Sequence, residues 1–205
     1  MKLNWANWIT IVRIFLIIPF VCCMLKIKDP VLGDAMRYTA VSVYLTMVVG
    51  DALDGYLARI KKQATKLGSF LDPVADKLLI TCACLLLVSQ RSNIEGFPLP
   101  PTVVVLIIGK DLLILIGFLI VYFITSQVYI APALIGKVAN DMQLSMVAGI
   151  LIAPEVSSFL PGWIWLLRIL WWSAAGTAIL ATLIYLRMAS QYIEKYEQNL
   201  ANNNK

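Results

Sequence analysis

Histidine is absent from the 205-residue chain, and charged residues are scarce. Without an imidazole the chain has no Ser-His-Asp or Cys-His catalytic set and no histidine-based metal site. Charged residues make up 14% and hydrophobic residues 60%, against about 25% and about 45–50% in soluble domains. This composition excludes an ordinary soluble domain. It also excludes a disordered chain, which needs low hydrophobicity and high net charge.

Cysteine is also rare, and its spacing excludes a disulfide framework. The four cysteines lie in apolar runs and form no C-x-x-C pair, so we interpret them as small buried apolar residues. The net charge of +5 is modest and is explained by membrane topology. We therefore expect no nucleic-acid partner.

Long apolar runs dominate what is present. A bilayer-spanning helix needs about 20 mostly apolar residues, and the sequence predicts an all-α integral membrane protein with six transmembrane helices. The six runs are residues 7–25, 36–59, 70–89, 101–124, 134–154 and 163–188. They form a single transmembrane domain over 1–190, followed by a polar C-terminal tail over 191–205.

The distribution of lysine and arginine predicts the orientation. The loops on the side of the N-terminus carry more of them, and the densest basic segment is 59–66. Cytoplasmic loops are enriched in these residues and face anionic lipid. We therefore expect a multi-pass protein of the cell's inner (cytoplasmic) membrane, with both termini inside and the site described next on the cytoplasmic side.

Four aspartates lie where two predicted helices meet. Asp51 and Asp54 end the second apolar run, and Asp72 and Asp76 begin the third. Residues three or four apart share a helix face, so the four carboxylates can converge. Their repulsion calls for a hard divalent cation, Mg²⁺, Mn²⁺ or Ca²⁺, and two such ions would suit displacement at phosphorus. A proton relay or ion path of a transporter is the alternative.

Small residues accompany these aspartates. Gly55, Ala58 and Gly68 lack bulk and let a flat ligand approach the helix backbone, and Arg59 offers a planar fork for phosphate. Ordinary helix packing in the membrane is the alternative for the small residues.

The combined pattern resembles the signature of the CDP-alcohol phosphatidyltransferase family. Every fixed position is present at the family spacing: Asp51-x-x-Asp54-Gly55-x-x-Ala58-Arg59, eight residues, then Gly68-x-x-x-Asp72-x-x-x-Asp76. The resemblance implies that family's fold, with six helices, and a homodimer. It also implies divalent-metal-dependent transfer of a phosphatidyl group from CDP-diacylglycerol to an alcohol, with release of CMP.

The resemblance also implies residue roles. The metal ligands would be Asp51, Asp54, Asp72 and Asp76, binding Mg²⁺ or Mn²⁺ and two ions in all, with Asp76 also the general base. The donor nucleotide would contact Asp51, Asp54, Gly55, Ala58, Arg59 and Gly68. Thr10 and Arg13 resemble an N-terminal family pattern, which implies a donor contact for Thr10, although a helix-start role is the alternative. Arg13 is expected to face the cavity and bind the acceptor.

The acceptor alcohol is the open question. Lys110 and Lys137 are the expected cations for an anionic acceptor, and the alternative for Lys110 is a structural ion pair with Asp111. The leading hypothesis is glycerol 3-phosphate, giving phosphatidylglycerol phosphate. The alternative is phosphatidylglycerol, the acceptor of the eukaryotic-type cardiolipin synthase branch. An ion-coupled membrane carrier is a remote third hypothesis.

Overall fold

The computed structural model covers the whole chain, and it describes residues 5–61, 68–125 and 134–203. For some residues within helices only the backbone is described. These are residues 5–7, 54–61, 68–70, 122, 195–197 and 199–203.

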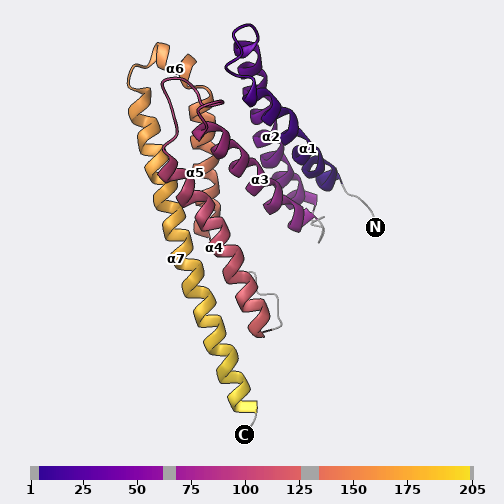
Figure 1. Cartoon of the computed structure of the whole chain (residues 1–205). Helices are drawn as coiled ribbons and strands as arrows, with labels where there is room; N and C mark the ends of the chain where they lie inside the picture. The colour runs from indigo at the N-terminus through magenta and orange to yellow at the C-terminus, as the bar shows by residue number, and fades with distance from the viewer. Residues whose placement is uncertain (1–4, 62–67, 126–133, 204–205) are drawn as a thin grey trace.

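The described residues fold into seven helices (Figure 1). In chain order these are α1 Trp5–Leu25, α2 Gly33–Lys61, α3 Gly68–Val88, α4 Pro101–Thr125, α5 Leu134–Leu151, α6 Ala153–Phe159 and α7 Trp163–Asn203. Each of the six predicted apolar runs coincides with most of one long helix, so the all-α prediction is confirmed. The short helix α6 differs from the prediction. α7 continues through most of the polar tail, for which the sequence suggests a frayed helix.

Several of these helices are long and apolar enough to cross a membrane, which makes the chain a membrane protein. Three qualify by length and composition, within α1, α4 and α7, and a fourth span results if the bent pair α5–α6 is counted as one. α2 and α3 are not among the three. Their charged residues, such as Asp51 and Asp76, lower the hydropathy of the same helices that carry the predicted site. The prediction of six spans is therefore confirmed in part.

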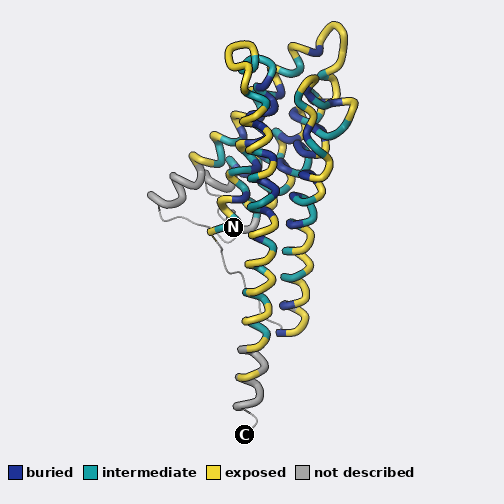
Figure 2. The backbone as a smooth tube through the Cα atoms, turned by 90° about the vertical axis from the view of Figure 1, so that its left-hand side faces the viewer, coloured by how far each residue is buried: buried dark blue, intermediate teal, exposed yellow. Residues whose placement is uncertain are grey.

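The helices form two groups that meet along α2, α3 and α5. α1 packs against α2 and α3, while α7 packs against α4 and α5 (Figure 1). Tyr44 of α2 is 1% exposed, and its hydroxyl donates to the backbone carbonyl of Leu144 in α5 at 2.9 Å. Figure 2 shows buried residues concentrated where the helices pack, whereas the far halves of α4 and α7 are mostly exposed or intermediate. Their exposed apolar side chains, such as Leu115 and Leu183, suit contact with lipid tails.

A tight turn joins α1 to α2 at the end of the molecule away from the aspartates. The Asp29 carboxylate accepts hydrogen bonds from the backbone N–H groups of Val31 and Leu32, at 2.9 and 3.1 Å. These bonds favour the ionised carboxylate and lower the pKa of Asp29. The Gly33 N–H then donates to the Asp29 carbonyl at 2.9 Å. These contacts of Asp29 and Gly33 set the direction in which α2 starts.

We expect Gly33→Ala to destabilise the protein by about 1–3 kcal/mol, the cost of forcing extra volume into a packed site. A Cβ at Gly33 would lie 2.5 Å from the backbone carbonyl oxygen of Ile27, which cannot rotate away. Gly176→Ala in α7 is the matched control, because its Cβ would have no heavy atom within 4 Å, and alanine favours a helix. Unfolding in detergent measures both variants. Equal stability of Gly33→Ala and the parent protein would contradict the expectation.

The predicted fifth span, 134–154, is broken near its end. α5 stops at Leu151, and α6 starts at Ala153 after a bend of 71°. Pro154 lies in the first turn of α6, where proline is tolerated because its missing N–H has no helical partner. Arg37 of α2 pairs with Glu155 of α6, with nitrogen–oxygen distances of 2.5 and 2.9 Å. This ion pair ties the bend to the start of α2.

Candidate active site

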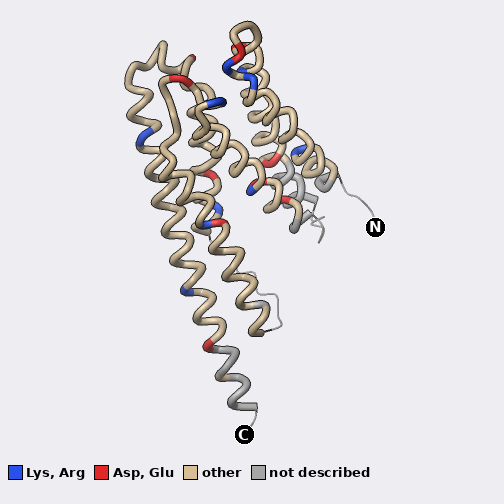
Figure 3. Tube along the Cα trace, in the orientation of Figure 1, with Lys and Arg blue, Asp and Glu red and all other residues tan. Residues whose placement is uncertain are grey.

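The four predicted aspartates lie toward the C-terminal end of α2 and the N-terminal end of α3, which follow one another in the sequence. Asp51 and Asp54 belong to the last part of α2, and Asp72 and Asp76 belong to the first part of α3. Figure 3 marks acidic and basic positions along the backbone of these helices, which lie beside α1. The side chain of Asp54 lies outside the described residues, so the geometry below concerns the other three carboxylates.

Arg13 of α1 connects α2 to α3. Its side chain is 4% exposed; Nη1 donates to Oδ1 of Asp51, and Nη2 donates to Oδ1 of Asp76 at 2.5 Å. Gly50 lies beside this arginine, since a Cβ at Gly50 would be 3.8 Å from Arg13 Cδ. A buried arginine needs such partners, because an unpaired charge in a low-dielectric environment is costly.

Thr10 brings in the third carboxylate from one turn earlier on α1. Its hydroxyl donates to Oδ1 of Asp72 at 2.6 Å, and the threonine is 1% exposed. One face of α1 therefore contacts Asp51, Asp72 and Asp76. The structure brings these three predicted residues together, as their helical spacing suggested.

The donor chemistry of this aspartate cluster (Asp51, Asp72 and Asp76) suits a hard divalent cation. The cluster has three carboxylates, and Arg13 pairs with two of them, Asp51 and Asp76. Negative charge is therefore in excess among these described side chains, and carboxylate oxygens are the ligands that Mg²⁺ and Mn²⁺ prefer. Among the described side chains, no three acidic or thiol groups are arranged closely enough to hold an ion by themselves. A complete ligand set therefore needs a further donor, and the sequence offers Asp54.

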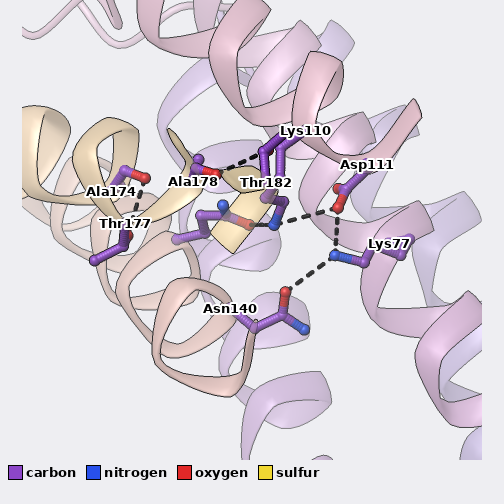
Figure 4. Close-up of polar contacts among 9 residues, drawn as sticks. Lys77, Lys110, Asp111, Asn140, Ala174, Thr177, Ala178 and Thr182 are labelled. Atoms are coloured by element: carbon purple, nitrogen blue, oxygen red, sulfur yellow. Dashed lines mark hydrogen bonds and ion pairs between the residues drawn. The ribbon is translucent and has the colours of Figure 1, made fainter. Parts of the chain in front are cut away.

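A second polar cluster lies between α3, α4 and α5 (Figure 4). Lys77 Nζ of α3 lies 2.5 Å from Asp111 Oδ1 of α4 and 3.2 Å from Asn140 Oδ1 of α5. Lys110 Nζ lies 3.2 Å from the same Asp111 oxygen and 3.4 Å from Gln143 Oε1. We call these five residues the lysine cluster.

The lysine cluster has one positive charge in excess and unused hydrogen-bonding capacity. Two lysines face one aspartate, and Lys110 and Gln143 are 3% and 0% exposed. Within the described part of the chain, Asp111 Oδ2 and Gln143 Nε2 are buried without a hydrogen-bond partner. Because Lys77 directly follows Asp76 in α3, a net-cationic polar region adjoins the anionic aspartate cluster. Such a pair of regions can hold a cation and an anionic or hydroxyl-bearing ligand side by side.

The other predicted residues are placed less fully. Asp54, Gly55, Ala58 and Arg59 lie in α2, and Gly68 begins α3, but their side chains are outside the described residues. Lys137 lies in the first turn of α5 with an exposed side chain.

Of the lysine cluster, only Lys110 was among the predicted site residues. Lys77, Asp111, Asn140 and Gln143 were not, yet Lys77 contacts Asp111 and Asn140, and Lys110 contacts Asp111 and Gln143. The available signal for Lys77 was a lysine adjacent to Asp76 inside an apolar helix. Asn140 carried a weaker signal, a polar residue in the first half of an apolar helix.

Comparisons with known proteins identify the family of the chain. The sequence profile described as CDP-alcohol phosphatidyltransferase matches residues 3–191. A protein of Pseudomonas fluorescens named CDP-diacylglycerol--glycerol-3-phosphate 3-phosphatidyltransferase is 40% identical over 112 residues, 55% of this chain and 53% of the relative. A protein of the same name from Yersinia enterocolitica is 32% identical over 155 residues, 76% of this chain and 80% of the relative. The chain thus matches about half the length of the first relative and most of the second.

Proposed function

The chain belongs to the CDP-alcohol phosphatidyltransferase family, and from that premise we propose that it transfers the phosphatidyl group of CDP-diacylglycerol to glycerol 3-phosphate. CMP and phosphatidylglycerol phosphate would be the products. The observation that carries this proposal is that the anionic aspartate cluster and the net-cationic lysine cluster are neighbours along α3, where Lys77 directly follows Asp76. The names of the two relatives described above favour glycerol 3-phosphate as the acceptor.

The proposed reaction is a displacement at the phosphorus atom that carries the diacylglycerol. The acceptor hydroxyl oxygen forms a bond to this phosphorus, the bond from phosphorus to the CMP oxygen breaks, and the hydroxyl proton passes to the Asp76 carboxylate. An alcohol is a weak nucleophile, so a carboxylate within hydrogen-bonding reach assists the attack. Asp76 suits this role because its side chain remains 17% exposed while Arg13 fixes it.

The family generally depends on divalent metal ions. We propose that Asp51, Asp54, Asp72 and Asp76 hold Mg²⁺ or Mn²⁺, with two ions in the complete site. The bound metal would neutralise negative charge on the diphosphate and on the departing CMP.

The donor and the acceptor need separate binding residues. We propose that Gly55, Ala58 and Gly68 let the nucleotide lie close to the helix backbone, and that Arg59 binds its phosphates. Lys110 and Lys137 would supply positive charge to the acceptor phosphate. Because the helices are apolar beyond these clusters, the acyl chains can remain among lipid tails while the headgroup reaches the aspartates.

We also propose a homodimer in the cytoplasmic membrane with the site on the cytoplasmic side. The aspartates lie next to the basic segment 59–66, which favours the leaflet rich in anionic lipid. A carrier would place its ionisable groups near the middle of the membrane, whereas these aspartates lie toward helix ends.

The purified protein, supplied with CDP-diacylglycerol, Mg²⁺ and a panel of acceptors, tests the proposal. We expect CMP release and phosphatidylglycerol phosphate with glycerol 3-phosphate, identified by mass spectrometry. Turnover only with phosphatidylglycerol would replace the proposal by cardiolipin synthesis. Absence of CMP release with every acceptor would reject the transferase.

In the same assay we expect Lys110→Gln to raise KM for glycerol 3-phosphate about tenfold. One charge-assisted hydrogen bond contributes about 1.5–3 kcal/mol, and about 1.4 kcal/mol corresponds to a factor of ten. The matched control is Lys28→Gln, because Lys28 is exposed and contacts the Gln90 carbonyl at the other end of the molecule. An unchanged KM in a folded Lys110→Gln protein would assign Lys110 to a structural ion pair with Asp111.

A further inference from the structure

Arg13 joins two carboxylates that belong to different helices. Its two terminal nitrogens contact Asp51 of α2 and Asp76 of α3, and the side chain is almost fully buried. We propose that Arg13, assisted by Thr10, is a positioning residue that fixes the spacing of the aspartate cluster for a divalent cation. This inference rests on the proposed function. In this inference Arg13 holds the metal-binding aspartates in place and does not bind the acceptor. Thr10 likewise holds Asp72 and does not bind the donor.

The contacts of Arg13 and Thr10 use one oxygen of each carboxylate. Arg13 and Thr10 each bond to Oδ1 of their aspartates, so these bonds leave the second oxygen of each carboxylate to another partner. Side chains that hydrogen-bond to metal-binding carboxylates without touching the metal fix the orientation of these ligands. Loss of such a side chain typically lowers metal affinity by 10–100-fold. α1 supplies such support to both helices at once.

Arginine suits this task better than lysine. The guanidinium is planar, permanently charged and able to donate in two directions at a fixed angle, whereas an ammonium is a point charge on a flexible stem. The guanidinium also offsets part of the repulsion between Asp51 and Asp76. Three carboxylates against one arginine still leave negative charge for a divalent ion.

The proposal is tested by Mn²⁺ binding to the 205-residue chain in detergent, measured by titration calorimetry and by loss of the free Mn²⁺ paramagnetic resonance signal. We expect Arg13→Lys and Arg13→Gln each to weaken Mn²⁺ binding about tenfold or more. The matched control is Arg37→Lys, because Arg37 also pairs with a carboxylate, Glu155. Arg37 lies fourteen residues before Asp51, which is about 20 Å along the helix at 1.5 Å per residue. The control should bind Mn²⁺ like the parent protein.

Thr10→Val provides a second variant in case the arginine variants do not fold. It keeps the side-chain shape and removes the hydroxyl that contacts Asp72. We expect Mn²⁺ binding to weaken about threefold or more. This is less than the roughly tenfold loss of metal affinity expected when a stronger contact to a metal ligand is removed. Thr39→Val is its control, because Thr39 is exposed and its hydroxyl contacts the Ala35 carbonyl of its own helix.

Two results would overturn the inference. One is Mn²⁺ binding of folded Arg13→Lys or Thr10→Val at the parent affinity. The other is tighter binding in Arg13→Gln, which would show that the arginine competes with the cation instead of arranging its ligands. A parent protein that binds no Mn²⁺ would instead reject the proposed metal-dependent function. The two failures are therefore distinguishable.

Discussion

Asp76→Asn should lower the turnover of CDP-diacylglycerol about 10³-fold, within the 10²–10⁴-fold range of general acid–base catalysis. Asparagine has nearly the same shape as aspartate, so it can keep contact with Arg13, but its amide cannot accept the proton of the acceptor hydroxyl. Donor binding should decrease much less than turnover. Steady-state CMP release and binding of CDP-diacylglycerol to the detergent-solubilised protein measure the two effects separately.

Asp141→Asn is the matched control for this substitution. Asp141 is an exposed aspartate of α5, so the same chemical change there should leave kcat within a factor of two or so, as for surface substitutions that change stability little. If folded Asp76→Asn retained kcat within tenfold of the parent, Asp76 would not be the general base. A loss of donor binding as large as the loss of turnover would indicate that Asp76 acts only in assembling the site.

The sequence predicted the helices well because their signal is local. Apolar runs bounded by turn residues such as Asp29 and Gly33 mark where each helix begins and ends. The break between α5 and α6 was not predicted, since Ile152 is itself apolar and the only local signal is Pro154 two residues later. The polar tail gives a weaker signal, because it has no apolar periodicity; the sequence suggests a frayed helix there, and α7 continues to Asn203.

The site was predictable to the extent that it depends on spacing within one helix. Asp72 and Asp76 share a face because they are four residues apart, and the structure places both against α1. The partners of Arg13 could not be derived in the same way, because they depend on how α1 is rotated against α2 and α3. The contact of Lys77 with Asp111 and Asn140 likewise requires three helices to pack at one level, which no local pattern encodes.

Chelation is the second perturbation for which we expect a large effect. Removal of divalent ions with EDTA should lower CMP release by about 10³-fold, because bound metal contributes several kcal/mol to the stabilisation of developing charge and about 1.4 kcal/mol corresponds to a factor of ten. Excess Mg²⁺ or Mn²⁺ should restore the rate, whereas matched concentrations of Na⁺ or K⁺ should not. The measurement is the initial rate of CMP release at fixed free-metal concentrations.

The metal titration also distinguishes a ligand from a base. Asp51→Asn removes one charged oxygen donor from the aspartate cluster, so half-maximal activity should require about tenfold more Mg²⁺ or Mn²⁺, the lower limit for losses around a metal site. Asp76→Asn should stay about 10³-fold slower than the parent protein at every metal concentration, because added cation cannot replace a proton acceptor. Asp34→Asn, which changes an exposed residue in the first turn of α2, should titrate like the parent protein. Full activity of the parent protein after exhaustive chelation would contradict metal dependence and, with it, the assignment of the aspartates as ligands.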